Sequence, residues 1–128
     1  MNSPTKTPIV DRLVVEDLPR GAITRLRVRM LYNAMGQPML MPIIVARGAA
    51  PGPIVGLTAA VHGNELNGMR IIHKLMRDLE IDELVGTIVA VPVVNIPGFL
   101  GNRREFSDGN DLNRIMPGRA DGSTAQVY

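Results

Sequence analysis

The chain has 128 residues and is 45% hydrophobic, which is enough for one modest domain with a core of aliphatic and methionine side chains. The formal net charge of +2 is too small to indicate a nucleic-acid partner, and the absence of cysteine excludes disulfides, thiolate metal sites and a cysteine nucleophile. No apolar run reaches the roughly 18 residues of a membrane span and no signal-peptide pattern opens the chain, so we expect a cytoplasmic protein with no membrane partner.

The first part of the chain predicts an extended lead-in and then a β-hairpin. Residues 1–20 are polar and interrupted by proline, which favours an extended segment. Apolar residues then alternate with Arg25, Arg27 and Arg29, as in a half-buried strand. These arginines form either a solvated strand face or a surface for an anion or a partner. After a turn, residues 39–48 predict the antiparallel partner strand.

The next segments predict a strand, a helix and another strand. Residues 54–61 are an almost continuous apolar run, typical of a strand covered on both faces. Apolar residues at three- and four-residue steps predict an amphipathic helix over residues 65–79. A further strand is expected over residues 87–95, with a bulge or an early end at Pro92. This order predicts a parallel strand pair and an α/β fold.

The last segment is rich in turns until a helix start near residue 123. A loop as long as residues 96–122 is either a loose surface excursion or a functional element. Ser123 and Gln126 have the spacing of a capping box, which opens a helix. The chain stops at Tyr128, and a single helical turn is not stable alone. We therefore expect a part of a longer protein, the alternative being a frayed end.

The stretch AAVHGNELNG, residues 59–68, places two candidate metal ligands where a strand is predicted to end. Ligands of α/β proteins bind at the carboxyl ends of parallel strands. A spacing of three residues brings His62 and Glu65 to the same side, and both side chains are good zinc donors. The same residues also fit a polar helix start, with Glu65 favoured by the helix dipole and Asn64 as a cap.

His73 is the only other histidine in the chain. It falls on the apolar stripe of the predicted helix, so we expect a packed or half-buried side chain rather than a ligand. A catalytic zinc ion usually has three protein ligands and a water molecule. The sequence therefore contains no third histidine to complete such a site.

A second polar cluster lies in the stretch NRREFSDGNDLNRIMPG. Arg103, Arg104 and Arg114 bring three guanidinium groups into one loop, with Asn113 beside the last of them. Arginine suits carboxylates because its two-pronged geometry matches theirs. Asp111 is expected to cap the local turn. The loop is therefore either a solvated polar segment or a pocket for an anionic substrate beside a polarising arginine.

The stretches HGNE, VPVVNIPGFL and DGNDLNRIMPG, in this order, resemble the succinylglutamate desuccinylase/aspartoacylase family of the zinc-carboxypeptidase superfamily. The resemblance covers roughly residues 54–128. It implies a mixed, largely parallel sheet flanked by helices, incomplete in this chain. Residues 21–128 would be the N-terminal part of the catalytic domain, after the lead-in. Met116 stands where the family more often has phenylalanine.

The resemblance also implies roles for the matching residues. His62 and Glu65 would be the first two ligands of a Zn²⁺ ion. Arg104 would polarise the scissile carbonyl, with Arg103 as the competing choice. The family's third ligand, a histidine, and its general base, a glutamate, lie beyond the part that matches. We therefore expect negligible activity from these 128 residues alone.

The resemblance finally implies a substrate class. Asn113 and Arg114 would bind the carboxylate of an N-acyl amino acid, whose amide bond the enzyme would hydrolyse. Two alternatives stay open: a zinc carboxypeptidase that acts on peptides, and a non-catalytic α/β binding module with a degenerate site. The acyl group, the amino acid and assembly into a homo-oligomer are not predicted by this sequence.

Overall fold

The computed structural model, which describes residues 6–128, contains one five-stranded sheet within these residues, in the order β1-β2-β3-β5-β4. The strands are β1 (Ile9–Val10), β2 (Ala22–Tyr32), β3 (Pro38–Arg47), β4 (Ala50–Thr58) and β5 (Val85–Val91). The α-helices are α1 (Asn67–Asp78), α2 (Ile96–Leu100), α3 (Leu112–Ile115) and α4 (Thr124–Val127). Two 3₁₀ helices cover Val15–Asp17 and Ile81–Glu83.

The strand pairing confirms both predicted units. β2 and β3 form the antiparallel hairpin, with Leu26 opposite Ile43. β4 and β5 pair in parallel, and α1 connects them, as expected for a strand–helix–strand unit. β3 and β5 pair antiparallel and join the two units into one mixed sheet. The fold is therefore α/β, as predicted.

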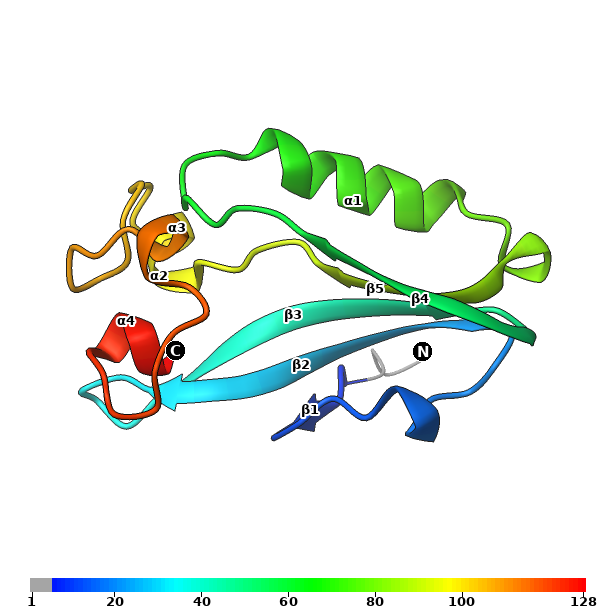
Figure 1. Cartoon of the computed structure of the whole chain (residues 1–128), viewed down its shortest axis with the longest axis horizontal. Helices are drawn as coiled ribbons and strands as arrows, with labels where there is room; N and C mark the ends of the chain where they lie inside the picture. Colours follow the sequence, from blue (N-terminus) through cyan, green and yellow to red (C-terminus); the bar gives the residue numbers. More distant parts are fainter. Residues whose placement is uncertain (1–5) are drawn as a thin grey trace, which may run out of the picture.

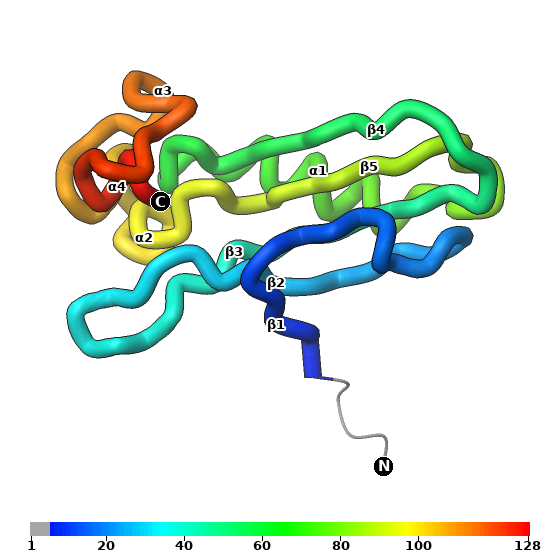
Figure 2. Tube along the Cα trace, turned by 60° about the horizontal axis from the view of Figure 1, so that its bottom comes forward, coloured from blue at the N-terminus to red at the C-terminus, as the bar shows by residue number. Residues whose placement is uncertain are grey.

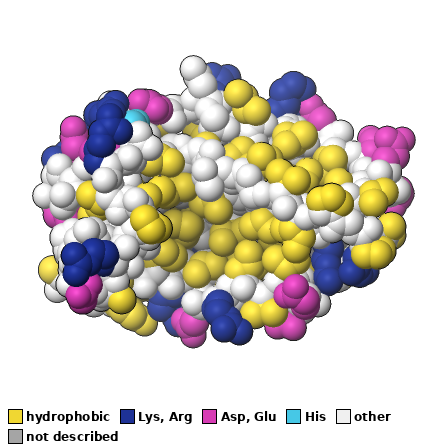
Figure 3. Space-filling view, viewed as in Figure 1, with side chains coloured by type: hydrophobic (Ala, Val, Ile, Leu, Met, Phe, Trp, Pro, Cys, Tyr) yellow, Lys and Arg dark blue, Asp and Glu magenta, His cyan; other side chains and the backbone are white. Residues whose placement is uncertain are grey.

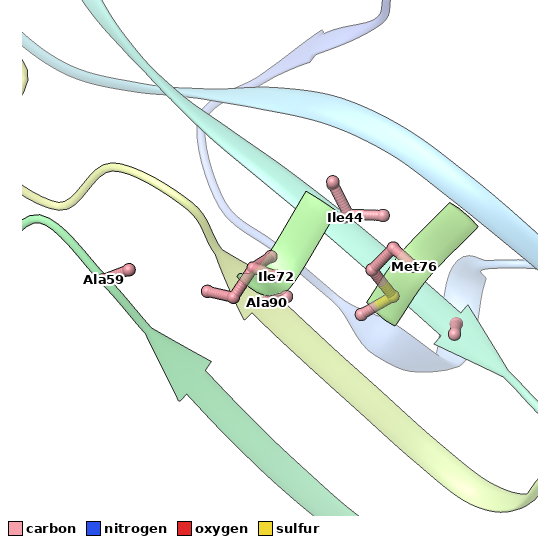
Figure 4. Close-up of a cluster of buried hydrophobic side chains, with 6 residues drawn as sticks. Ile44, Ala59, Ile72, Met76 and Ala90 are labelled. Carbon is pink, nitrogen blue, oxygen red and sulfur yellow. The ribbon is translucent and has the colours of Figure 1, made fainter. Parts of the chain in front are cut away.

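The sheet has a layer on each face (Figure 1). Because side chains alternate along a strand, Ile43 and Ile44 point to opposite layers. Ile44 packs with Ala90 of β5 and with Ile72 and Met76 of α1 (Figure 4). The other face packs against the lead-in, through the residues Leu26, Ile43, Val45, Val10, Leu13 and Leu18. The lead-in thus covers this face of the sheet, and its β1 pairs with β2 at the sheet edge. Residues 1–5 lie outside the described part of the chain.

The arginine row of β2 lies on the same side as Ile23, which packs beneath α1. Arg25 is exposed, whereas Arg27 and Arg29 are partly buried. Arg29 pairs with Asp11 of the lead-in. The alternating arginines were predicted to form either a solvated strand face or a surface for an anion or a partner. Only part of this face is solvated in the structure.

β4 differs from its prediction in position and in burial. It covers Ala50–Thr58 instead of residues 54–61, and within the described residues it pairs only with β5. Ile54 and Val55 are 60% and 50% exposed, so the expectation of a strand covered on both faces is wrong here. The apolar run predicts a tendency to be buried, but the sheet order makes β4 an edge strand. Figure 3 shows the resulting broad hydrophobic surface.

α1 is shorter than predicted and does not bury its histidine. Its buried residues are Ile72 and Met76. His73 is exposed, so the expectation of a packed or half-buried side chain is wrong. The physical reason is the helical rotation of about 100° per residue, which turns the side chain after Ile72 away from the buried stripe. No helix within residues 6–128 is long and apolar enough to cross a membrane.

The turn-rich segment after β5 is anchored by a core of its own. β5 ends directly before Pro92, which is one of the two expected outcomes, because proline has no N–H for the ladder. Phe106 is fully buried and packs with Leu112 and Ala125. Its ring also lies 4.8 Å from that of Tyr128, between centroids. Residues 96–122 are therefore held against the end of the sheet, which excludes the loose excursion.

The predicted capping box is present at the start of α4. The Ser123 hydroxyl accepts a hydrogen bond from the backbone N–H of Gln126, and the Gln126 side chain accepts one from the backbone N–H of Ser123. Two of the free donors at the helix start are satisfied in this way. This short helix closes the second core over Phe106.

Candidate metal and substrate site

Three segments gather at the end of the sheet where the parallel strands β4 and β5 stop. They are the loop between β4 and α1, the segment around α2, and the segment around α3 (Figures 1 and 2). Charged side chains and a histidine lie next to one another at this end of the surface (Figure 3). A crevice outside the carboxyl ends of parallel strands is the usual ligand position in α/β proteins.

His62 is the centre of the cluster and is only 8% exposed. Its Nδ1 atom lies 3.0 Å from Oε1 of Glu65, and its Nε2 atom lies 3.0 Å from Oδ1 of Asp111. Both ring nitrogens therefore have a carboxylate partner. The ring orientation is defined from two sides, by segments far apart in the sequence.

The His62–Glu65 pair is formed by a turn and not by the first turn of α1. The backbone N–H of Glu65 donates to the carbonyl of His62 at 3.1 Å, and α1 begins only at Asn67. Leu66 is the N-cap and makes no side-chain cap bond, so Asn64 does not cap α1, and Glu65 lies before the first turn instead of within it. The spacing of three residues brings the side chains together as predicted, through different local geometry.

Each ring nitrogen of His62 faces a carboxylate oxygen, and an ionised carboxylate only accepts hydrogen bonds. A metal ion in place of a proton between Nδ1 and Oε1 of Glu65 would be shared by two adjacent donor atoms, while Nε2 would still donate to Asp111. A histidine ligand whose other ring nitrogen donates to a carboxylate is the usual arrangement around a metal ion.

Arg104 joins the same cluster from the segment after α2. Its Nη1 atom donates to Oε1 of Glu65 at 3.4 Å, and its Nη2 atom donates to Oδ2 of Asp111 at 3.3 Å. The side chain is 44% exposed, so its guanidinium also faces the open side of the cluster. Arg103 makes no ion pair in the part of the chain that the structure describes. The geometry therefore favours Arg104 over Arg103 as the arginine beside the candidate ligands.

Asp111 is the site residue whose main contact the sequence did not predict. The expected local cap is present, since Oδ1 accepts the backbone N–H of Asn113 at 2.9 Å. The contact with His62 was missed because no local spacing signals a partner 49 residues away. Partial desolvation favours the neutral acid, but hydrogen bonds from His62, the Asn113 amide and Arg104 outweigh it and lower the pKa of Asp111.

Asn113 and Arg114 lie in the short helix α3, directly after Asp111. Both are exposed, and neither side chain has a hydrogen-bond partner among residues 6–128. The structure therefore places them beside the cluster without including them in its contacts. They are free to contact a ligand at the open side of the site.

The donor set fits part of a zinc site. An imidazole nitrogen and a carboxylate oxygen are both zinc donors, and the Nδ1 and Oε1 atoms here are adjacent. Within residues 6–128, no group of three or more His, Cys, Asp or Glu side chains is arranged to hold a metal ion. The described residues thus offer two candidate ligands, fewer than the three of a usual catalytic site.

The sequence matches a known family and a curated enzyme. Residues 51–127 match the profile of the succinylglutamate desuccinylase/aspartoacylase catalytic domain. The N-alpha-acetyl-L-2,4-diaminobutyric acid deacetylase of Halomonas elongata is 36% identical over 95 residues, which are 73% of this chain and 27% of that enzyme.

Solved structures have the same fold. A succinylglutamate desuccinylase/aspartoacylase from Rhodobacter sphaeroides superposes with a TM-score of 0.75 at 32% identity, over 86% of this chain and 35% of that one. A metallo-carboxypeptidase from Burkholderia cenocepacia superposes with a TM-score of 0.58 at 23% identity, over 88% of this chain and 33% of that one, and shares the fold. The chain thus spans between 27% and 35% of the length of these relatives.

Proposed function

Because the chain belongs to the succinylglutamate desuccinylase/aspartoacylase catalytic-domain family, we propose that the protein is a zinc-dependent hydrolase that removes the acyl group from an N-acyl amino acid. The observation that carries this proposal is the four-residue cluster of His62, Glu65, Arg104 and Asp111. The products are a carboxylic acid and a free amino acid or amine. A cytoplasmic location stays a prediction.

His62, through Nδ1, and Glu65 are the proposed ligands of the zinc ion. A bound zinc ion lowers the pKa of a water molecule and polarises a carbonyl group. In the metal-bound form, Asp111 would accept a hydrogen bond from Nε2 of His62 and so hold the ring with Nδ1 beside Glu65. A third ligand and a general base are required in addition, and His73 is a poor candidate because it lies exposed on α1.

Arg104 is the proposed catalytic arginine. Its guanidinium lies beside Glu65, so it can donate to the oxygen of a carbonyl group that reacts next to the ligands. Negative charge develops on that oxygen in the tetrahedral intermediate, and a fixed donor stabilises it. Arg103 has no comparable position in the described structure.

Asn113 and Arg114 are the proposed binding residues for the carboxylate of the substrate. Their exposed side chains start from α3, whose first turn is tied to the cluster through Asp111. An arginine and an amide together can donate several hydrogen bonds to one carboxylate. A carboxylate bound by these two side chains would lie near the proposed zinc ligands.

The family match favours a deacylase over the two alternatives. The similarity to the metallo-carboxypeptidase concerns the fold alone, whereas the relative with 36% identity is a deacetylase of an acylated amino acid. A non-catalytic module would not need an arginine placed against a candidate metal ligand, as Arg104 is against Glu65. A small N-acyl amino acid is therefore the preferred substrate class.

The test is the zinc content and the deacylase activity of the complete protein with His62→Ala or Glu65→Ala. Each variant should lose zinc by elemental analysis and lose hydrolysis of N-acetyl or N-succinyl amino acids. The matched control is His73→Ala, which removes an exposed histidine and should keep both. Unchanged zinc in both ligand variants would contradict the ligand assignment. Zinc binding without deacylation would favour a different reaction.

A further inference from the structure

Asn95 is a fully buried polar residue between the two loops that carry the candidate ligands and the candidate arginine. Its Nδ2 atom donates to the carbonyl oxygens of Val61 and Arg104, each at 3.3 Å. Its Oδ1 atom accepts the backbone N–H of Gly98 at 2.9 Å. Both polar atoms of the amide are thus satisfied, and they join three separate segments.

The backbone around Asn95 strengthens the same connection. The N–H of Asn95 donates to the carbonyl of Ala60 at 3.0 Å, and the N–H of Gly63 donates to the carbonyl of Arg104 at 3.3 Å. The Arg104 carbonyl therefore accepts from the Asn95 side chain and from the residue that follows His62. The two segments that meet here are those from which the His62 ring and the Arg104 guanidinium extend.

The three segments also approach one another closely. A Cβ atom on Gly63 would lie 2.0 Å from the carbonyl carbon of Gly98, and a Cβ atom on Gly98 would lie 2.6 Å from Nδ2 of Asn95. Such distances leave no room for a side chain at either glycine. The Asn95 amide therefore contacts all three segments at a junction where neither glycine leaves room for a side chain.

We propose that Asn95 is a positioning residue that fixes the separation between the ligand loop and Arg104. The amide does not touch the substrate. Its Nδ2 group donates one hydrogen bond to the carbonyl of Val61, the residue before His62, and one to the carbonyl of Arg104. A shift of the guanidinium by about 1 Å is enough to reduce catalysis roughly 100-fold. The inference rests on the proposed function for the roles of Arg104 and His62, while the junction itself is independent of it.

The alternative is that Asn95 only caps α2, and the choice of variants separates the two roles. Asn95→Asp keeps an oxygen for the Gly98 N–H but removes both Nδ2 donors. Asn95→Ser also keeps a cap oxygen, is too short to reach the two carbonyls, and avoids a buried charge if the aspartate variant does not fold. Ser123→Ala is the cap control, because it removes the cap of α4 without touching the junction.

The first measurement is hydrogen exchange of the Gly63 amide, which donates to the Arg104 carbonyl. In Asn95→Ser, its protection should fall at least tenfold relative to amides in β3, whereas Ser123→Ala should leave it within twofold. Unchanged protection at Gly63 would overturn the proposal, whatever the protein catalyses. Met76→Ala, in the core beneath α1, controls for a general loss of stability.

The second measurement is a double-mutant cycle for kcat in the complete protein, with Arg104→Ala as the second change. Asn95→Ser should lower kcat by about 10- to 100-fold with Arg104 present and less than threefold without it, with KM little changed. An equal loss in both backgrounds would assign Asn95 a structural role only and overturn the proposal. If Arg104→Ala alone leaves kcat unchanged, the catalytic role proposed for Arg104 is wrong, and the hydrogen-exchange result still tests whether Asn95 holds the two segments together.

Discussion

The Nε2 atom of His62 lies 3.0 Å from the Oδ1 atom of Asp111, a residue 49 positions further along the chain. The contact connects the loop after β4 with the first residue of the α3 segment. Because Oδ1 also accepts the N–H of Asn113, one carboxylate oxygen fixes both the imidazole and the start of the helix that carries Arg114. The proposed metal ligand and the proposed substrate contacts are therefore positioned by the same side chain.

Asp111→Asn should weaken zinc binding to the complete protein by roughly 10- to 100-fold. The amide keeps an oxygen for the helix start but removes the negative charge that orients His62 and raises its strength as a ligand. A competition titration with a chelator measures the affinity. Asp121→Asn is the control, since Asp121 is exposed and pairs with Arg119, away from the site. A zinc affinity within twofold of that of the parent protein would show that Asp111 does not support zinc binding.

Arg104→Ala should lower kcat for an N-acyl amino acid by roughly 10²- to 10³-fold, with a smaller change in KM. The loss is that of one donor to the oxyanion of the tetrahedral intermediate. Arg103→Ala changes the same residue type one position earlier and should stay within a few fold of the parent rate. Steady-state kinetics of the two variants decide between them, and a larger effect at Arg103 would reverse the assignment.

Arg114→Ala and Asn113→Ala should mainly raise KM. Each change removes hydrogen bonds to a charged group, which contribute about 1.5–3 kcal/mol, or roughly 10- to 100-fold in binding. A substrate whose carboxylate is replaced by a carboxamide provides the matched comparison. The parent enzyme should prefer the carboxylate, and the Arg114 variant should lose most of that preference. A preserved preference would place the carboxylate elsewhere.

Tyr128 should make folding stability depend on alkaline pH. Burial raises the pKa of its hydroxyl from 10.0 to about 12, and the hydroxyl donates to the Val94 carbonyl at 2.8 Å. The folded protein holds this proton more tightly than the unfolded chain does. Its contribution is therefore complete below pH 10 and is lost as the pH rises from 10 to 12, on the order of 2–3 kcal/mol.

Denaturant unfolding at a series of pH values checks the Tyr128 effect. Tyr128→Phe should flatten the decline in stability between pH 10 and 12. The control is Tyr32→Phe, since Tyr32 is 62% exposed and should leave the decline intact. Equal slopes for the parent protein and the Tyr128 variant would show that another group controls alkaline stability.

The elements that local sequence predicted best are those whose signal lies within a few residues. Alternation located the β2–β3 hairpin, the proline at position 92 ended β5, and Ser123 with Gln126 formed the predicted capping box. His62 and Glu65 meet for the same reason, because three residues separate them and one turn joins them. Neighbouring residues along the chain decide such contacts, so the local sequence is enough to predict that they form.

Burial was predicted less well, because it depends on the layer that each element meets. The apolar run of β4 and the stripe of α1 both indicated covered side chains, yet Ile54 and His73 are exposed. Hydrophobic periodicity gives the face of an element that favours burial. It does not give the position of a strand in the sheet or the exact edge of a helix contact.

By itself, the sequence determined the α/β class, the order of the elements and the residue types that could bind a metal and a carboxylate. Only the tertiary structure decided that Asp111 holds His62, that Arg104 and not Arg103 reaches Glu65, and that Asn95 joins their loops. The physical reason is that hydrogen bonds act over about 3 Å. Whether two residues far apart in the chain come within that distance depends on how the sheet, α2 and α3 pack together.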